Sequence, residues 1–91
     1  MSVQWLFDVI QSRRKNPSEG SYTSRLLAEG LPKITQKVGE EATETVVAAL
    51  TQDDQRLIEE VADLTYHTLV LLAARGLSPV DIEAELEKRH K

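Results

Sequence analysis

The sequence predicts an all-α protein of about five helices. Glycine and proline interrupt the chain at three places, and the segments between them carry apolar residues at helical rather than alternating spacing. The two longest segments are joined by a short polar turn, TQDDQ, so we expect two long antiparallel helices. The chain of 91 residues has room for one core and lacks a run of eighteen apolar positions, which predicts one domain over residues 1–91 and no membrane span.

The first two expected helices are short and separated by a loop. An apolar stripe runs through residues 3–14, and the loop KNPSEGS ends that helix. A helix over residues 23–29 follows, and Gly30 stops it.

The remaining helices start or stop at glycine and proline. Pro32 suits the first turn of a helix that continues to about Leu50, because its missing N–H costs nothing there. The next helix is expected over residues 54–75 and ends at Gly76, where a left-handed C-cap is predicted. The Ser-Pro pair at 78–79 is a typical start for the last helix.

The fourth expected helix carries apolar residues in nearly every direction around its axis. A helix that is apolar all round must be surrounded, and four other helices in so small a chain could hardly enclose it. We therefore expect a homodimer with a core like a four-helix bundle; the alternative is a monomer with an exposed apolar patch. These residues are Val61, Ala62, Leu64, Leu69, Val70, Leu71, Leu72, Ala73 and Ala74.

Composition excludes several classes of function. The net charge of −4 argues against general binding to nucleic acid or to an anionic membrane surface. The N-terminal segment lacks the pattern of a signal peptide, so we expect a cytoplasmic protein. With no cysteine in the chain, a bound metal would be held by oxygen atoms or by the two histidines, which favours hard cations.

Three glutamates crowd the middle of the third expected helix, in the stretch KVGEEATE. Glu40, Glu41 and Glu44 fall within an arc of roughly 100°, and Lys37 lies on the same side. Taken alone, this pattern is typical of an amphipathic helix with a solvated charged face. The side expected to lie opposite carries Ile34, Val38, Ala42 and Ala49.

Two further carboxylates lie on the apolar fourth helix. Glu60 and Asp63 are three residues apart on one face, and the next turns of that face are apolar. A carboxylate buried without a partner costs several kcal/mol, so each must be neutralised, paired with a base or bound to a metal. The nearby bases are Arg56 and His67, and neither balances the negative charge.

The acidic faces of the two long helices are expected to meet. One face carries E-x-x-E at Glu41 and Glu44, and the other carries E-x-x-D at Glu60 and Asp63. Converging carboxylates repel one another unless divalent cations lie among them, and ligation by oxygen alone suits Mg²⁺ or Mn²⁺. A di-iron site of the ferritin type would need E-x-x-H, which Asp63 does not supply.

A cage of carboxylates around divalent cations is suited to the hydrolysis of phosphoanhydrides. Carboxylate-held Mg²⁺ keeps positions open for water and phosphate oxygens, and basic side chains can meet the outer phosphates. The chain has no G-x-x-x-x-G-K-[ST] motif and is therefore no P-loop protein. The basic candidates are Arg13, Arg14, Lys15, Arg25, Lys33 and Lys37, although each alone is typical of a solvated surface charge.

Two single residues need separate interpretation. His67 lies one turn beyond Asp63 and would orient that carboxylate, contact the substrate, or be a core histidine bonded to a neighbour. Gly39 points away from the acidic face, which indicates close helix packing there.

The stretches KITQKVGEEATE and EVADLTYHTLVLL resemble the phosphoribosyl-ATP pyrophosphohydrolases of histidine biosynthesis, a branch of the MazG-like all-α nucleoside triphosphate pyrophosphohydrolases. The resemblance spans essentially the whole chain, including RRKNPSEGSYTSRLL and GLSPVDIEAELEKRH. The acidic motifs are common to the wider superfamily, whereas SYT and ADLTYH are typical of the histidine-pathway branch.

This resemblance implies a dimeric, Mg²⁺-dependent enzyme that hydrolyses phosphoribosyl-ATP to phosphoribosyl-AMP and pyrophosphate. It implies metal ligation by Glu41, Glu44, Glu60 and Asp63, with Glu40 assisting the water. The residues that it places near the substrate are Ser21, Tyr22, Thr23, Lys33 and Lys37.

Two alternatives stay open. A house-cleaning pyrophosphohydrolase that acts on free nucleoside triphosphates would use the same metal cage with a different substrate pocket. A non-catalytic helical dimer whose acidic face binds a basic partner is the other. Acids placed among leucines, as Glu60 and Asp63 are, argue against this second alternative, because a solvated binding face has no need of them.

Overall fold

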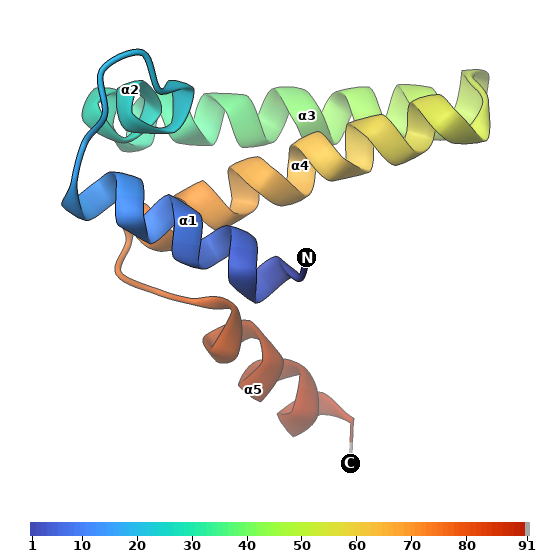
Figure 1. The fold of residues 1–91 in the computed structure, drawn as a ribbon. Coiled ribbons are helices and arrows are strands. Elements are labelled where there is room, and N and C mark those ends of the chain that lie inside the picture. Colours follow the sequence, from blue (N-terminus) through green and yellow to red (C-terminus); the bar gives the residue numbers. More distant parts are fainter. Residues whose placement is uncertain (91) are drawn as a thin grey trace.

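A computed structural model describes residues 1–90 and contains five helices and no strand within that range (Figure 1). The all-α prediction is confirmed, and every predicted helix boundary lies within one residue of the observed one. Residue 91, the last of the predicted domain, lies outside the described range. The helices are α1 (Val3–Lys15), α2 (Tyr22–Glu29), α3 (Leu31–Thr51), α4 (Asp54–Ala74) and α5 (Pro79–Arg89).

Side-chain caps fix the start of three helices. The hydroxyl of Ser2 accepts a hydrogen bond from the backbone N–H of Trp5 at 3.1 Å, and Ser21 caps α2 in the same way. Asp53 caps α4 through the N–H of Arg56 at 2.9 Å. These bonds satisfy backbone donors that the first helical turn leaves unpaired, so the starts are encoded locally.

Left-handed glycines end α2 and α4. Gly30 has a φ of 86° and Gly76 a φ of 72°, a region that side chains with a Cβ atom disfavour. After α4, the N–H of Leu77 bonds to the carbonyl of Leu72 at 2.8 Å, and the N–H of Gly76 bonds to Ala73 at 3.1 Å. These two backbone hydrogen bonds together form a Schellman motif, which is the C-cap that the sequence predicts.

The two long helices form an antiparallel hairpin, and the core lies at one end of it. Helices α1 and α2 cover the half that contains the start of α3 and the end of α4, while the other half extends beyond them (Figure 1). Burial of apolar side chains holds this end together. The core residues are Phe7, Ile10, Leu26, Ile34, Leu69, Val70, Leu72 and Ala73.

The rotation of α3 differs from the prediction. Ile34, Glu41 and Ala48 are all buried, whereas Ala49 is exposed. Residues seven apart are only about 20° short of two full turns, so Glu41 shares a stripe with Ile34 rather than lying opposite it. The predicted opposition was wrong: Glu41 faces inward, and Glu40 and Glu44 face solvent.

The packing role expected for Gly39 is also wrong within this chain. Gly39 is exposed, and a Cβ atom added to it would meet no other atom within 4 Å. Its backbone φ is not in the left-handed region either. Neither space nor backbone geometry in the chain therefore requires glycine at this position.

Helix α5 extends away from the other four (Figure 1). Its first turn is anchored by Asp81, whose carboxylate accepts the N–H of Ser78 at 2.9 Å. Val80, Ile82 and Leu86 are exposed on it. None of the helices in residues 1–90 combines the length and the hydropathy that crossing a membrane requires.

Candidate metal centre

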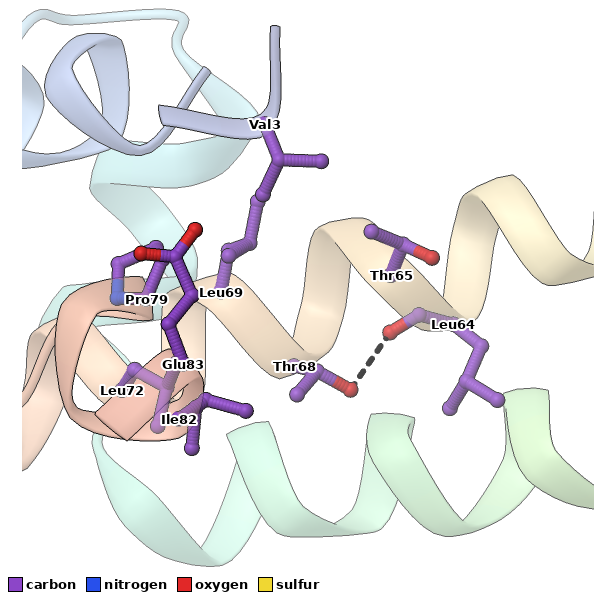
Figure 2. A pocket seen from close by; sticks show the side chains of 9 residues that line it. All are labelled: Val3, Leu64, Thr65, Thr68, Leu69, Leu72, Pro79, Ile82 and Glu83. Carbon is purple, nitrogen blue, oxygen red and sulfur yellow. Dashed lines mark hydrogen bonds between the residues drawn. The ribbon is translucent and has the colours of Figure 1, made fainter. Parts of the chain in front are cut away.

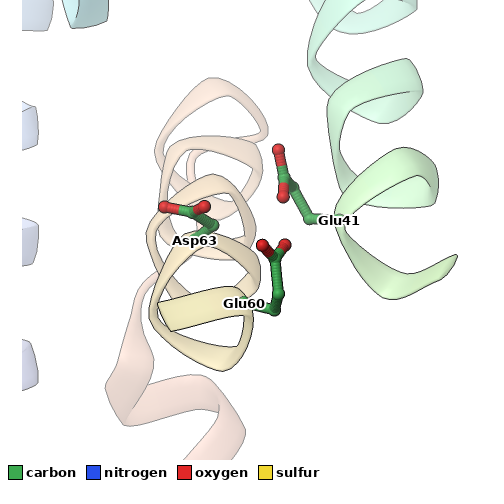
Figure 3. A group of neighbouring side chains, drawn as sticks. All are labelled: Glu41, Glu60 and Asp63. Carbon is green, nitrogen blue, oxygen red and sulfur yellow. The ribbon is translucent and has the colours of Figure 1, made fainter. Parts of the chain in front are cut away.

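Three carboxylates from the two long helices converge near the middle of the hairpin. Glu41 extends from α3 toward Glu60 and Asp63 of α4, and one oxygen of each lies within 4.8 Å of the others (Figure 3). Antiparallel packing of α3 and α4 brings these residues together, and the i,i+3 spacing puts Glu60 and Asp63 on one face. The predicted meeting of the acidic faces is therefore observed for these three residues.

We call Glu41, Glu60 and Asp63 the cage. Its two glutamates are buried, and each has one carboxylate oxygen without a hydrogen-bond partner. Glu41 is 7% exposed and Glu60 is 5% exposed, and the Oε2 atom of each has no hydrogen-bond partner among the described residues. Leaving a buried charged oxygen unsatisfied is costly. The other oxygens face cations, since Lys37 Nζ lies 3.8 Å from Glu41 Oε1, and Arg56 donates to Glu60 Oε1.

The cage suits a divalent cation. Oxygen ligands of one Mg²⁺ lie at about 2.1 Å from the ion, hence about 3 to 4 Å from one another. The three carboxylates, with one oxygen each within 4.8 Å of the others, are therefore close enough to share one ion. The donor set consists of carboxylates alone, which hard cations prefer. Two buried oxygens without partners are the groups that such an ion would satisfy.

A polar hollow of about 300 Å³ opens beside the cage. Glu44 lies there, exposed, and is not one of the three converging carboxylates. Glu44 lines the same hollow as Glu60 and therefore lies near the cage. Its role as a metal ligand stays a prediction. The lining residues are Thr43, Glu44, Val47, Gln52, Arg56 and Glu60.

Arg56 was expected only as a base near Glu60, and the structure shows that it belongs to this site. It donates hydrogen bonds to both Glu59 and Glu60, and these bonds, that to Glu59 most, raise the pKa of its guanidinium. The pKa of Glu59 is lowered, first by the hydrogen bond from Gln55 and then by Arg56. The i,i+4 spacing of Arg56 and Glu60 was the available signal.

A second polar cluster joins the start of α2 to α4. Tyr22 Oη lies 2.9 Å from His67 Nε2, and Thr23 is hydrogen-bonded to Tyr66. His67 is buried, and its Nδ1 atom lies 2.7 Å from the backbone carbonyl of Asp63. His67 is thus bonded on both ring nitrogens one helical turn from the cage, and its predicted contact with substrate stays a prediction.

The predicted basic residues are dispersed. Lys37 lies on the rim of the cage, 3.9 Å from Glu40 Oε1 as well as near Glu41. Lys33 and Arg13 are exposed, and within residues 1–90 neither forms an ion pair. Arg25 lies over the ring of Tyr22, with 5.7 Å from its guanidinium carbon to the ring centroid.

A larger hollow of about 510 Å³ lies between the start of α1, α4 and α5 (Figure 2). Its wall is mainly apolar, and its one charged residue, Glu83, is an acid. This hollow therefore has no cationic side chain to meet a polyphosphate, and its single carboxylate forms no cluster that would hold a metal. The lining residues are Val3, Leu64, Thr65, Thr68, Leu69, Leu72, Pro79, Ile82 and Glu83.

The sequence matches the family described as phosphoribosyl-ATP pyrophosphohydrolase over residues 3–90. The chain belongs to this family. It is 49% identical to a phosphoribosyl-ATP pyrophosphatase of Clostridium botulinum over 89 residues, which cover 98% of this chain and 81% of the relative. It is 51% identical to the enzyme of that name from Sulfurisphaera tokodaii, with 94% and 92% covered. The corresponding relative of Erythrobacter litoralis is 53% identical, with 97% and 85% covered.

Family membership agrees with the resemblance seen in the sequence, and the structure adds the geometry of the acidic motifs. The first motif of this family member contributes one buried carboxylate, Glu41, and two exposed ones, Glu40 and Glu44. The second contributes Glu60 and Asp63. The converging set of three, two of them buried and Asp63 exposed, therefore comes from both motifs.

Proposed function

We propose that this chain hydrolyses phosphoribosyl-ATP to phosphoribosyl-AMP and pyrophosphate, a step of histidine biosynthesis, with Mg²⁺ as the cofactor. Membership in the phosphoribosyl-ATP pyrophosphohydrolase family supports the reaction and the substrate. The observation that carries the proposal is the cage, in which two buried glutamate oxygens lack a partner. Mn²⁺ has the same ligand preference and would serve in place of Mg²⁺. The cytoplasm remains the proposed compartment.

The residues proposed to hold the metal are Glu41, Glu44, Glu60 and Asp63. A Mg²⁺ ion held there would offset negative charge on the phosphate oxygens and acidify a water molecule. In the proposed hydrolysis, the water oxygen would attack one phosphorus of the α–β anhydride and the bridging P–O bond would break, which separates phosphoribosyl-AMP from pyrophosphate. Glu40 is exposed beside the cage and is proposed to accept the proton of the water as a general base.

The proposed substrate contacts come from the first half of α3, the end of α1, the start of α2 and α4. Lys33 and Lys37 would meet phosphate oxygens, and Lys37 already lies within 4 Å of two glutamates. Arg13, at the end of α1, is a further candidate for the phosphates. The other proposed contacts lie near the hydrogen bond that joins the start of α2 to α4. They are Ser21, Tyr22, Thr23 and His67.

We propose a homodimer that covers the free half of the hairpin. Leu50 is 79% exposed and Ile58 is 60% exposed, on opposite sides of the turn between α3 and α4. A small chain rarely leaves such large apolar side chains together in solvent. Further exposed apolar residues of this half are Val46, Val47 and Val61.

The test is pyrophosphate release, with Mg²⁺, from phosphoribosyl-ATP beside ATP and dUTP, with Glu44→Ala as the control protein. Activity on phosphoribosyl-ATP alone, lost in the variant, is the expected result. Preference for a free triphosphate would instead place the chain among house-cleaning pyrophosphohydrolases. Activity on none of the three would revive a non-catalytic dimer that binds a basic partner.

A further inference from the structure

Arg56 bridges two glutamates in different environments. Its guanidinium donates one hydrogen bond to Glu59, whose side chain is 46% exposed, and another to Glu60, whose side chain is 7% exposed. Arg56 itself is 47% exposed on the wall of the polar hollow. It therefore links the buried carboxylate of Glu60 to the partly exposed carboxylate of Glu59.

Glu60 is shared between this arginine and the cage. Its Oε1 atom accepts from Arg56, its Oε2 atom is buried without a partner, and the residue is one of the three converging carboxylates. A divalent cation bound to Glu60 would repel the guanidinium at this short range. Arg56 thus compensates the buried charge of Glu60 and at the same time opposes metal binding.

The surroundings of Arg56 allow it to leave Glu60 without losing every partner. The bond to Glu59 lies outside the cage and does not depend on it. The freed N–H groups would face the hollow, which Thr43 and Gln52 also line with hydrogen-bonding groups. A phosphate oxygen bound to a metal in the cage would be a better partner for a guanidinium there than water.

We propose that Arg56 is a displaceable counter-ion, paired with Glu60 when no metal is bound and bound to a phosphate group in the hollow when a divalent cation occupies the cage. The residue is a positioning residue in the first state and a phosphate ligand in the second. The proposal rests on the proposed function for the phosphate, whereas the competition with metal follows from the Arg56–Glu60 pair itself.

The experiment compares Arg56→Met, Arg56→Lys and the control Arg75→Met, in which an exposed arginine at the other end of α4 is changed. First, the affinity for Mn²⁺ without substrate is measured from the electron paramagnetic resonance signal of the free ion. Second, binding of inorganic pyrophosphate is measured by calorimetry with Mn²⁺ in excess. Far-UV circular dichroism verifies that each variant is helical.

The two measurements are expected to change in opposite directions. Arg56→Met should bind Mn²⁺ about three- to tenfold more tightly, because a nearby positive charge is gone. The same variant should bind pyrophosphate about tenfold more weakly, because a charge-assisted hydrogen bond is lost. Arg56→Lys keeps the positive charge and should therefore bind Mn²⁺ with the affinity of the wild type. The control Arg75→Met should change neither the Mn²⁺ affinity nor the pyrophosphate affinity.

Either of two results would overturn the proposal. Weaker or unchanged Mn²⁺ binding by Arg56→Met would show that the arginine merely supports the local structure. Unchanged pyrophosphate binding would show that it never reaches the phosphate. Neither result bears on whether wild-type protein hydrolyses phosphoribosyl-ATP, so failure here is distinguishable from failure of the proposed function.

Discussion

Tyr22 donates its hydroxyl hydrogen to Nε2 of His67, a residue 45 positions later in the chain. The direction follows from the other side of the ring, where Nδ1 lies 2.7 Å from the carbonyl oxygen of Asp63. A carbonyl can only accept, so the tautomer with its hydrogen on Nδ1 fits this pair, and in that tautomer Nε2 accepts the hydroxyl hydrogen. The bond ties the start of α2 to α4 one turn from the cage.

Removing this hydroxyl should destabilise the protein. Tyr22→Phe leaves the Nε2 atom of a histidine that is 6% exposed without a donor, which should lower the free energy of unfolding by about 1–2 kcal/mol. Urea unfolding measures the change. In a His67→Leu background the same Tyr22→Phe substitution should cost much less, and an equal cost in both backgrounds would contradict the pairing.

Neighbouring glutamates of α3 should differ in metal binding. Glu41→Gln removes a buried cage carboxylate, so the Mn²⁺ dissociation constant should rise at least about tenfold. Glu40→Gln changes an exposed neighbour and should alter that constant by less than about threefold while slowing turnover. Calorimetric titration with Mn²⁺ makes the comparison, and an equal loss in both variants would make Glu40 a ligand rather than the base.

Gly39→Ala should stabilise the chain. The position is helical and has free space around the added Cβ atom, so alanine should raise the free energy of unfolding by about 0.5–1 kcal/mol. Thermal and urea unfolding at matched protein concentration measure it. A decrease would mean that a partner molecule packs against Gly39, in which case the dissociation constant of the dimer should rise as well.

The free half of the hairpin should carry the dimer contact. Ile58→Glu places a charge on the proposed apolar interface and should shift wild-type dimer toward monomer by at least about tenfold in dissociation constant. Sedimentation equilibrium measures the shift. Gln36→Glu, an added charge at an exposed polar position of α3, is the matched control and should leave the dimer intact. A wild-type protein that sediments as a monomer would contradict the dimer proposal.

Local chemistry made the helices predictable from the sequence. The glycines at 30 and 76 end helices through backbone conformations that depend on a few neighbouring residues. The spacing of Glu60 and Asp63 likewise determines that both lie on one face of α4. The sequence by itself therefore determined the helices, their order and the acidic motifs from which a metal site can be built.

Only the tertiary structure decided which acids turn inward and what they meet. The rotation of α3 against α4 buries Glu41 and exposes Glu40 and Glu44, a result that depends on packing over the whole length of both helices. The Tyr22–His67 bond likewise joins residues that no local pattern connects. Helix ends follow from interactions within one or two turns, whereas the site depends on how apolar faces far apart in the chain fit together.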